Sequence, residues 1–154
     1  MSAVASLIER EIALITEFID VLGKEQEALK LANVSELPAL TSAKKELVDS
    51  LNALETERLA TLGMANGEPG SKLMANWLSN HPLDIDAATM WKKLLGLARQ
   101  AKALHDMNAA LVDMHLRHTG ELLSALTQQT TRPPLYGASG QTLSSSGSRI
   151  VDSA

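Results

Sequence analysis

The chain has 154 residues, no cysteine and a net charge of -4, and 45% of its residues are apolar although it holds only one Phe, one Tyr and two Trp. The lack of cysteine excludes disulfides and thiolate metal sites, and the aliphatic composition favours packed helices over a β-sandwich. No apolar run approaches the roughly 20 residues of a membrane span, and the N-terminus lacks a secretion signal. We therefore expect a soluble, cytoplasmic protein without stable membrane insertion.

Charge is distributed unevenly along the chain. Residues 1–68 contain twelve acidic and six basic side chains, a balance of -6, whereas the remainder from Pro69 contains six acidic and eight basic side chains, a balance of +2. Neither part has the dense basic stripe that a phosphate backbone requires. We therefore expect no nucleic acid among its partners.

Two helices are predicted in the first half from apolar positions that alternate in steps of four and three residues. The first seam is Ile8, Ile12, Ile15, Ile19, Leu22, Gln26 and Leu29, and the second is Leu37, Leu40, Lys44, Leu47, Leu51, Leu54, Arg58 and Thr61. Asn33-Val34-Ser35 breaks the pattern, with Ser35 expected to cap the second helix and Pro38 in its first turn. So short a connection predicts an antiparallel helical hairpin.

Lys44 and Arg58 occupy positions on the second seam that would otherwise be apolar. One interpretation is that their aliphatic stems cover apolar surface while the charges reach water. The other is that they bind a partner.

A short and a long helix are predicted in the second half. After the glycine-rich stretch 63–70, Ser71 is expected to cap a helix that ends at Leu78, before His81-Pro82. The long helix is expected from Asp84 or Asp86 to about Gln129. Its seam is Met90, Leu94, Leu97, Ala101, Leu104, Asn108, Leu111, His115, His118, Leu122 and Ala125, with Leu126 adjoining. About 43 residues would span roughly 65 Å, longer than the first helix, so apolar surface at one end should stay exposed as a docking surface.

The second half of this long seam turns polar at Asn108, His115 and His118. A buried Asn at a seam position fixes register at a cost in stability, or else this half contacts a partner. The two histidines lack a convergent third ligand, so we expect no metal site. No paired carboxylates, phosphate-binding loop or activated nucleophile is present either, and we expect neither an enzyme nor a cofactor.

The chain is predicted to divide into a helical bundle, residues 1–129, and a Pro/Gly/Ser-rich tail, residues 130–154. The large apolar residues of the tail are Leu135, Tyr136, Leu143, Ile150 and Val151. Their burial would contribute at most roughly 8–15 kcal/mol, whereas ordering about 20 backbone residues costs about 20–40 kcal/mol. Since Leu143, Ile150 and Val151 share one helix face, we expect a flexible tail or a helix that forms on docking.

The whole pattern resembles the FlgN-like flagellar export chaperones. The resemblance covers the N-terminal hairpin, the long helix with Asn108-x-x-Leu111, the segment Tyr136-Gly137-x-x-Gly140-Gln141-Thr142 and the terminal stretch around Arg149 and Ala154. It implies an all-α fold: a hairpin, one short and one long helix in a coiled-coil-like bundle, and a flexible or conditionally helical tail.

The resemblance also implies a function and its residues. Such chaperones bind C-terminal helical segments of hook–filament junction proteins, prevent premature assembly or degradation, and deliver them to the membrane protein of the type III export gate; the export ATPase complex is a further candidate partner. Docking at the gate would involve Tyr136, Gly137 and Gly140. Client binding would involve Leu143, Ile150 and Val151, together with Asn108, Leu111 and His115. The polar stretch Ser144–Ser148 departs from a strong client-binding helix. The alternatives are a self-associating coiled-coil scaffold and a secretion chaperone for a different client.

Overall fold

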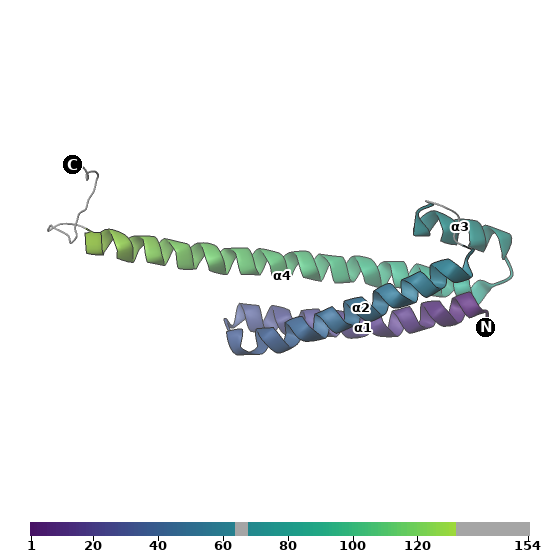
Figure 1. Cartoon of the computed structure of the whole chain (residues 1–154), viewed down its shortest axis with the longest axis horizontal. Coiled ribbons are helices and arrows are strands. Elements are labelled where there is room, and N and C mark those ends of the chain that lie inside the picture. Colours follow the sequence, from purple (N-terminus) through teal and green to yellow (C-terminus); the bar gives the residue numbers. More distant parts are fainter. Residues whose placement is uncertain (64–67, 132–154) are drawn as a thin grey trace. The chain divides into compact units, whose positions relative to one another are not determined.

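The computed structural model describes residues 1–63 and 68–131. Within them the chain forms α1 (Ala3–Lys30), the 3-10 turn η1 (Val34–Glu36), α2 (Leu37–Thr61), α3 (Gly70–Asn80) and α4 (Ile85–Thr131), with no strand in these ranges (Figure 1). The predicted all-α class is confirmed. The structure is described as two units, Met1–Leu111 and Val112–Ala154. The tail residues predicted to bind a client or the gate lie outside the described residues.

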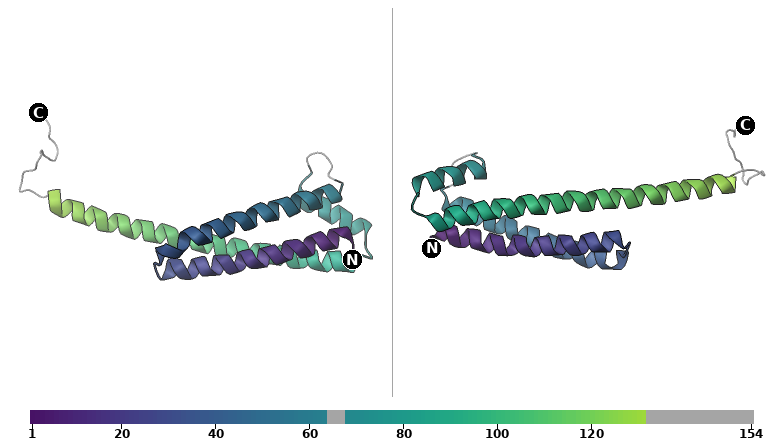
Figure 2. Two further views of the ribbon diagram at one scale, coloured as in Figure 1. Left: turned by 60° about the horizontal axis from the view of Figure 1, so that its bottom comes forward. Right: turned by 180° about the vertical axis from the view of Figure 1, so that it is seen from behind.

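In the first unit, α1 and α2 lie side by side and antiparallel, as the views in Figure 1 and Figure 2 agree. The predicted seam of α1 faces inward, since its positions from Ile8 to Leu29 are buried or half-buried. The core combines side chains from α1, α3 and α4: Val4, Ile8, Ile15, Leu22, Met74, Leu94 and Ala101. The antiparallel helical hairpin is therefore as the spacing predicted, whereas its core is shared with α3 and α4.

The turn between α1 and α2 contains neither glycine nor proline. The N–H of Asn33 donates to the carbonyl of Ala28 at 2.8 Å, and the N–H of Ala32 donates to that of Leu29 at 3.3 Å. This pair of bonds closes a helix end around one residue in the left-handed conformation. That residue is Ala32, with φ 53°. A position that usually prefers glycine is here occupied by alanine.

The helix starts agree only in part with the predicted caps. The carboxylate of Asp84 accepts from the N–H of Ala87 at 3.0 Å, as expected for the cap of α4. Ser35 was wrongly predicted to cap α2, because its hydroxyl instead donates to Asn33 at 2.8 Å. The prediction that Ser71 caps α3 was also wrong, because α3 begins at Gly70, after Pro69, without a side-chain cap. The hydroxyl of Ser2 accepts from the N–H of Ala5 and so caps α1.

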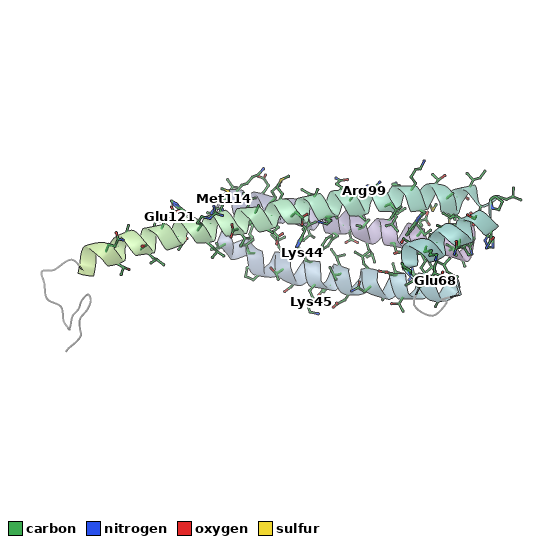
Figure 3. All side chains as sticks on the ribbon, turned by 90° about the horizontal axis from the view of Figure 1, so that it is seen from above. Lys44, Lys45, Glu68, Arg99, Met114 and Glu121 are labelled. Carbon is green, nitrogen blue, oxygen red and sulfur yellow. The ribbon has the colours of Figure 1, made fainter. Side chains whose placement is uncertain are left out.

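The charges of Lys44 and Arg58 are bound inside the first unit. Arg58 is only 5% exposed and donates to Glu11 of α1 at 2.6 and 3.2 Å, and its guanidinium lies 4.8 Å from the ring centroid of Trp91. The ammonium of Lys44 lies 2.7 Å from Glu25. The interpretation that both charges reach water was therefore wrong for Arg58. Figure 3 shows Lys44 on the inner side of α2 and its neighbour Lys45 on the outer side.

Candidate functional site

The second unit presents an exposed apolar face on α4. Its large side chains are between 41% and 68% exposed: Val112, Leu116, Leu122, Leu123 and Leu126. With His115 and Thr119 these residues occupy steps of three and four along the helix, and therefore share one side of it. We call this set of seven residues the exposed face of α4.

This exposed face continues the side of α4 that packs in the first unit. Leu94, Ala101 and Asn108 are buried at seven-residue intervals, and Leu104 is half-buried between them. Seven residues correspond to nearly two helical turns, so positions further along the same series keep the same side. The sequence thus specifies an apolar face along α4. The part of this face before Val112 is buried, and the part from Val112 onward is exposed.

The opposite side of α4 in the second unit carries the charges. Asp113 and Arg117 form an ion pair one turn apart, with both side chains about two-thirds exposed. Glu121 follows on the same side of the helix, and Figure 3 marks it together with Met114. Because these three charges centre on the side opposite Thr119, an apolar partner could cover the exposed face and leave them in water.

A polar cluster marks the end of the buried part of α4. Asn108 is 2% exposed, and its amide nitrogen donates to the carbonyl of Leu22 and to the carboxylate of Glu25, both at 2.9 Å. Glu25 also binds Lys44, so three helices contribute to one cluster. Asn108 Oδ1 has no hydrogen-bond partner in this arrangement. These bonds hold one register of α4 against α1, as the register interpretation of Asn108 expected.

The structure separates the residues predicted to bind a client. Asn108 is buried and bonded within the first unit, Leu111 is half-buried, and His115 is exposed on the second unit. The remaining predicted positions, Leu143, Ile150 and Val151 for the client and Tyr136, Gly137 and Gly140 for the gate, lie outside the described residues. Roles in binding stay predictions for all of them.

Residues absent from the predicted site make up most of the exposed face. Val112, Leu116 and Leu123 lie beside the predicted seam rather than on it. The signal that could have found them is the pairing of neighbours at steps of three and four, which widens a helix stripe beyond its central seam. Among the described residues, no group of three His, Asp or Glu side chains is arranged to hold a metal ion.

None of the helices in residues 1–63 and 68–131 combines the length and the apolar character needed to cross a membrane. Comparisons with curated proteins and with solved structures found no match. The family model described as FlgN protein, in contrast, matches residues 1–144. That range contains both helices of the hairpin, α3, α4 and the Tyr136 segment. The chain therefore belongs to the FlgN family, whose members are flagellar export chaperones.

Proposed function

We propose that this chain binds amphipathic C-terminal helices of hook–filament junction proteins in the cytoplasm, and that it delivers them to the type III export gate. Two observations support this proposal: the match to the FlgN family over residues 1–144, and the exposed face of α4. The second observation carries the mechanism, because a chaperone needs apolar surface that its own fold leaves accessible.

The exposed face suits a helical client. An amphipathic helix presents apolar side chains at the same steps of three and four, so it can lie along α4 and cover the stripe. Burying a large aliphatic side chain contributes about 1.5–3 kcal/mol, and much of the total is offset by the entropy lost on association. Five such side chains therefore suit a reversible complex, in which a client is protected but can still be released.

We propose binding without a catalytic step or a cofactor. A client helix that is left free can aggregate or assemble through its apolar stripe, and covering that stripe prevents both. Release then needs only a competitor for the same contacts. A competitor that binds the free chaperone shifts the equilibrium between bound and free client towards free client, by mass action. The export gate would be that competitor.

The tail extends the proposal on the strength of the family resemblance. Tyr136, flanked by Gly137, would dock at the gate, because a tyrosine ring supplies a large contact area at small entropic cost. Leu143, Ile150 and Val151 would add contacts to the client. In this arrangement Tyr136 docks the chain at the gate without touching the client, and the gate competes for the client contacts only after docking, so substitution of Tyr136 should affect delivery but not client affinity.

The client-binding part is tested with purified C-terminal fragments of junction proteins in a calorimetric titration. Leu116→Glu and Leu123→Glu place a charge on the exposed face and should weaken binding at least about tenfold, or by about 1.4 kcal/mol. Ser124→Glu is the matched control on the charged side of the same helix turn and should bind normally. Equal affinities of all three variants, or no binding by the unmodified chain, would refute the proposal.

The delivery part is tested with Tyr136→Ala in flagellated cells. We expect junction proteins to accumulate in the cytoplasm while calorimetry shows unchanged client affinity. Loss of client affinity in parallel with export would assign Tyr136 to client binding rather than to the gate.

A further inference from the structure

We propose that the exposed face of α4 pairs with the same face of a second copy of this chain, antiparallel and with a two-fold axis at Thr119. The proposal concerns the chain alone and does not rest on client binding. It starts from the positions of the seven residues of the face, which lie at -7, -4, -3, 0, +3, +4 and +7 from Thr119. A two-fold axis requires such a self-complementary set, because each residue then meets the position with the opposite offset.

The pairing places aliphatic side chains opposite one another at two of its three paired positions. Val112 would lie beside Leu126 of the second copy and Leu116 beside Leu122, while His115 would lie beside Leu123 and Thr119 beside its own equivalent. Asp113, Arg117 and Glu121 centre on the opposite side of the helix, so the pairing buries none of these three charges. Steps of four and three are the spacing with which two helices interdigitate their side chains over a long contact.

Thr119, a small residue, lies at the centre of this arrangement. Two helices approach most closely where the side chains between them are small. The large side chains at either end, Val112 and Leu126, are 41% and 59% exposed and would close the contact there.

The length of the face also suits a second copy. In the proposed register, Val112 lies level with residue 126 of the second copy, and Asn108 lies level with residue 130. Pairing therefore uses the exposed positions and leaves the bonds of Asn108 to Leu22 and Glu25 in place. A contact between two helix segments of this length buries a surface area at the lower end of the range for stable interfaces. We therefore expect a dimer that dissociates on dilution.

The first test is the mass of the full chain as a function of concentration, by sedimentation equilibrium. We expect the mass to rise from 16.5 kDa towards twice that value between about 1 and 300 µM, a range typical of weak interfaces. Leu122→Glu should raise the dimer dissociation constant at least about tenfold without changing the helical circular-dichroism signal. Ser124→Glu, on the charged side, should dimerise normally.

The second test fixes the direction of pairing by thiol cross-linking, which is selective because the chain has no cysteine. Thr119→Cys should oxidise to a covalent dimer. A mixture of Val112→Cys and Leu126→Cys should cross-link, whereas each alone should not, since like positions would lie about 21 Å apart along the helix. Ser124→Cys is the control for random collision.

Two results would overturn the proposal. One is a mass that stays at 16.5 kDa at every concentration while Thr119→Cys oxidises no faster than Ser124→Cys, which would leave the face to a client or to the chain's own tail. The other is efficient self-cross-linking of Val112→Cys, which would show a parallel pair. Client titrations measure a different quantity, so failure here and failure of the proposed function are distinguishable.

Discussion

Arg58 shows how a charge can be stabilised inside an aliphatic bundle. Its guanidinium makes two bonds to Glu11 and lies over the ring of Trp91, although Nη1 has no partner. The attraction within a buried ion pair does little more than offset the cost of removing both charges from water. Removing one member, however, leaves the other charge buried without a partner. The position of Arg58 on the seam was evident in the sequence. Its partner was not, because helical spacing does not show which residues of two helices lie level.

Replacing Glu11 by Ala should therefore destabilise the first unit by about 3–5 kcal/mol, because Arg58 would keep a buried charge. The double variant Glu11→Leu with Arg58→Met should recover most of that loss. Urea unfolding followed by circular dichroism measures both. The ion pair of Arg10 and Glu57, which also joins α1 to α2 but is more than half exposed, supplies the control. Its removal should cost less than about 1 kcal/mol, and an equal cost for both pairs would contradict this account.

Asp84 predicts a pH dependence at the start of α4. Hydrogen bonds from Ser2 and from the N–H of Ala87 lower the pKa of this carboxyl below its usual value. A lowered folded-state pKa contributes stability above the unfolded pKa of about 3.9, and that stability is lost as the pH falls through the folded pKa. Carbon NMR of the carboxyl should give a titration midpoint below about 3.9.

The matched variant for Asp84 is Asp84→Asn, which retains the capping oxygen but does not titrate. Its thermal midpoint should fall less than that of the parent chain between pH 5 and pH 2.5. A carboxyl midpoint at or above the unfolded value would show that these hydrogen bonds are weak in solution.

At the scale of the element, α4 has one apolar face with two environments. Leu94 is 6% exposed and Leu122 is 54% exposed, although both belong to the same predicted seam. Periodicity reports that a helix side is apolar, and it does not report whether the chain itself covers that side. The same limit explains why the helix seams were predicted while the residues that widen the exposed face were missed.

Leu94→Ala should cost about 2–5 kcal/mol, because it leaves a cavity in the packed core. Leu122→Ala should change stability by less than about 0.5 kcal/mol, as expected of an exposed position. Both are measured by urea unfolding below 1 µM, where self-association is negligible. A large loss from Leu122→Ala under these conditions would mean that the exposed face is packed within a single chain.

Turns and caps were less predictable than helices. Ser35 and Ser71 have the chemistry of capping residues, yet a 3-10 turn precedes α2 and Pro69 precedes α3. Ala32 takes the left-handed conformation because the backbone bonds of the turn require it, and an alanine gives no sequence signal for that conformation. Local propensity is a weak guide where backbone geometry at a helix end decides the structure.

For the whole molecule, the buried core and the proposed binding surface lie in different parts of one chain. The first unit has a core and buried polar bonds, whereas the described residues from Val112 to Gln128 are exposed throughout. Helices gain most of their stability from packing, and segments with few buried contacts open at low free energy. A binding segment that opens easily can release its partner, while the core keeps the chain folded.

Hydrogen exchange measured by mass spectrometry tests this division. In dilute solution, amides of residues 112–128 should exchange at least about a hundredfold faster than those of residues 90–108, since local opening there should cost several kcal/mol less than global unfolding. Raising the protein concentration, or adding a client fragment, should slow exchange in residues 112–126 and leave α2 unchanged. Equal protection of both ranges in dilute solution would mean that the second unit already holds its structure alone, and neither pairing nor client binding would then be needed to order it.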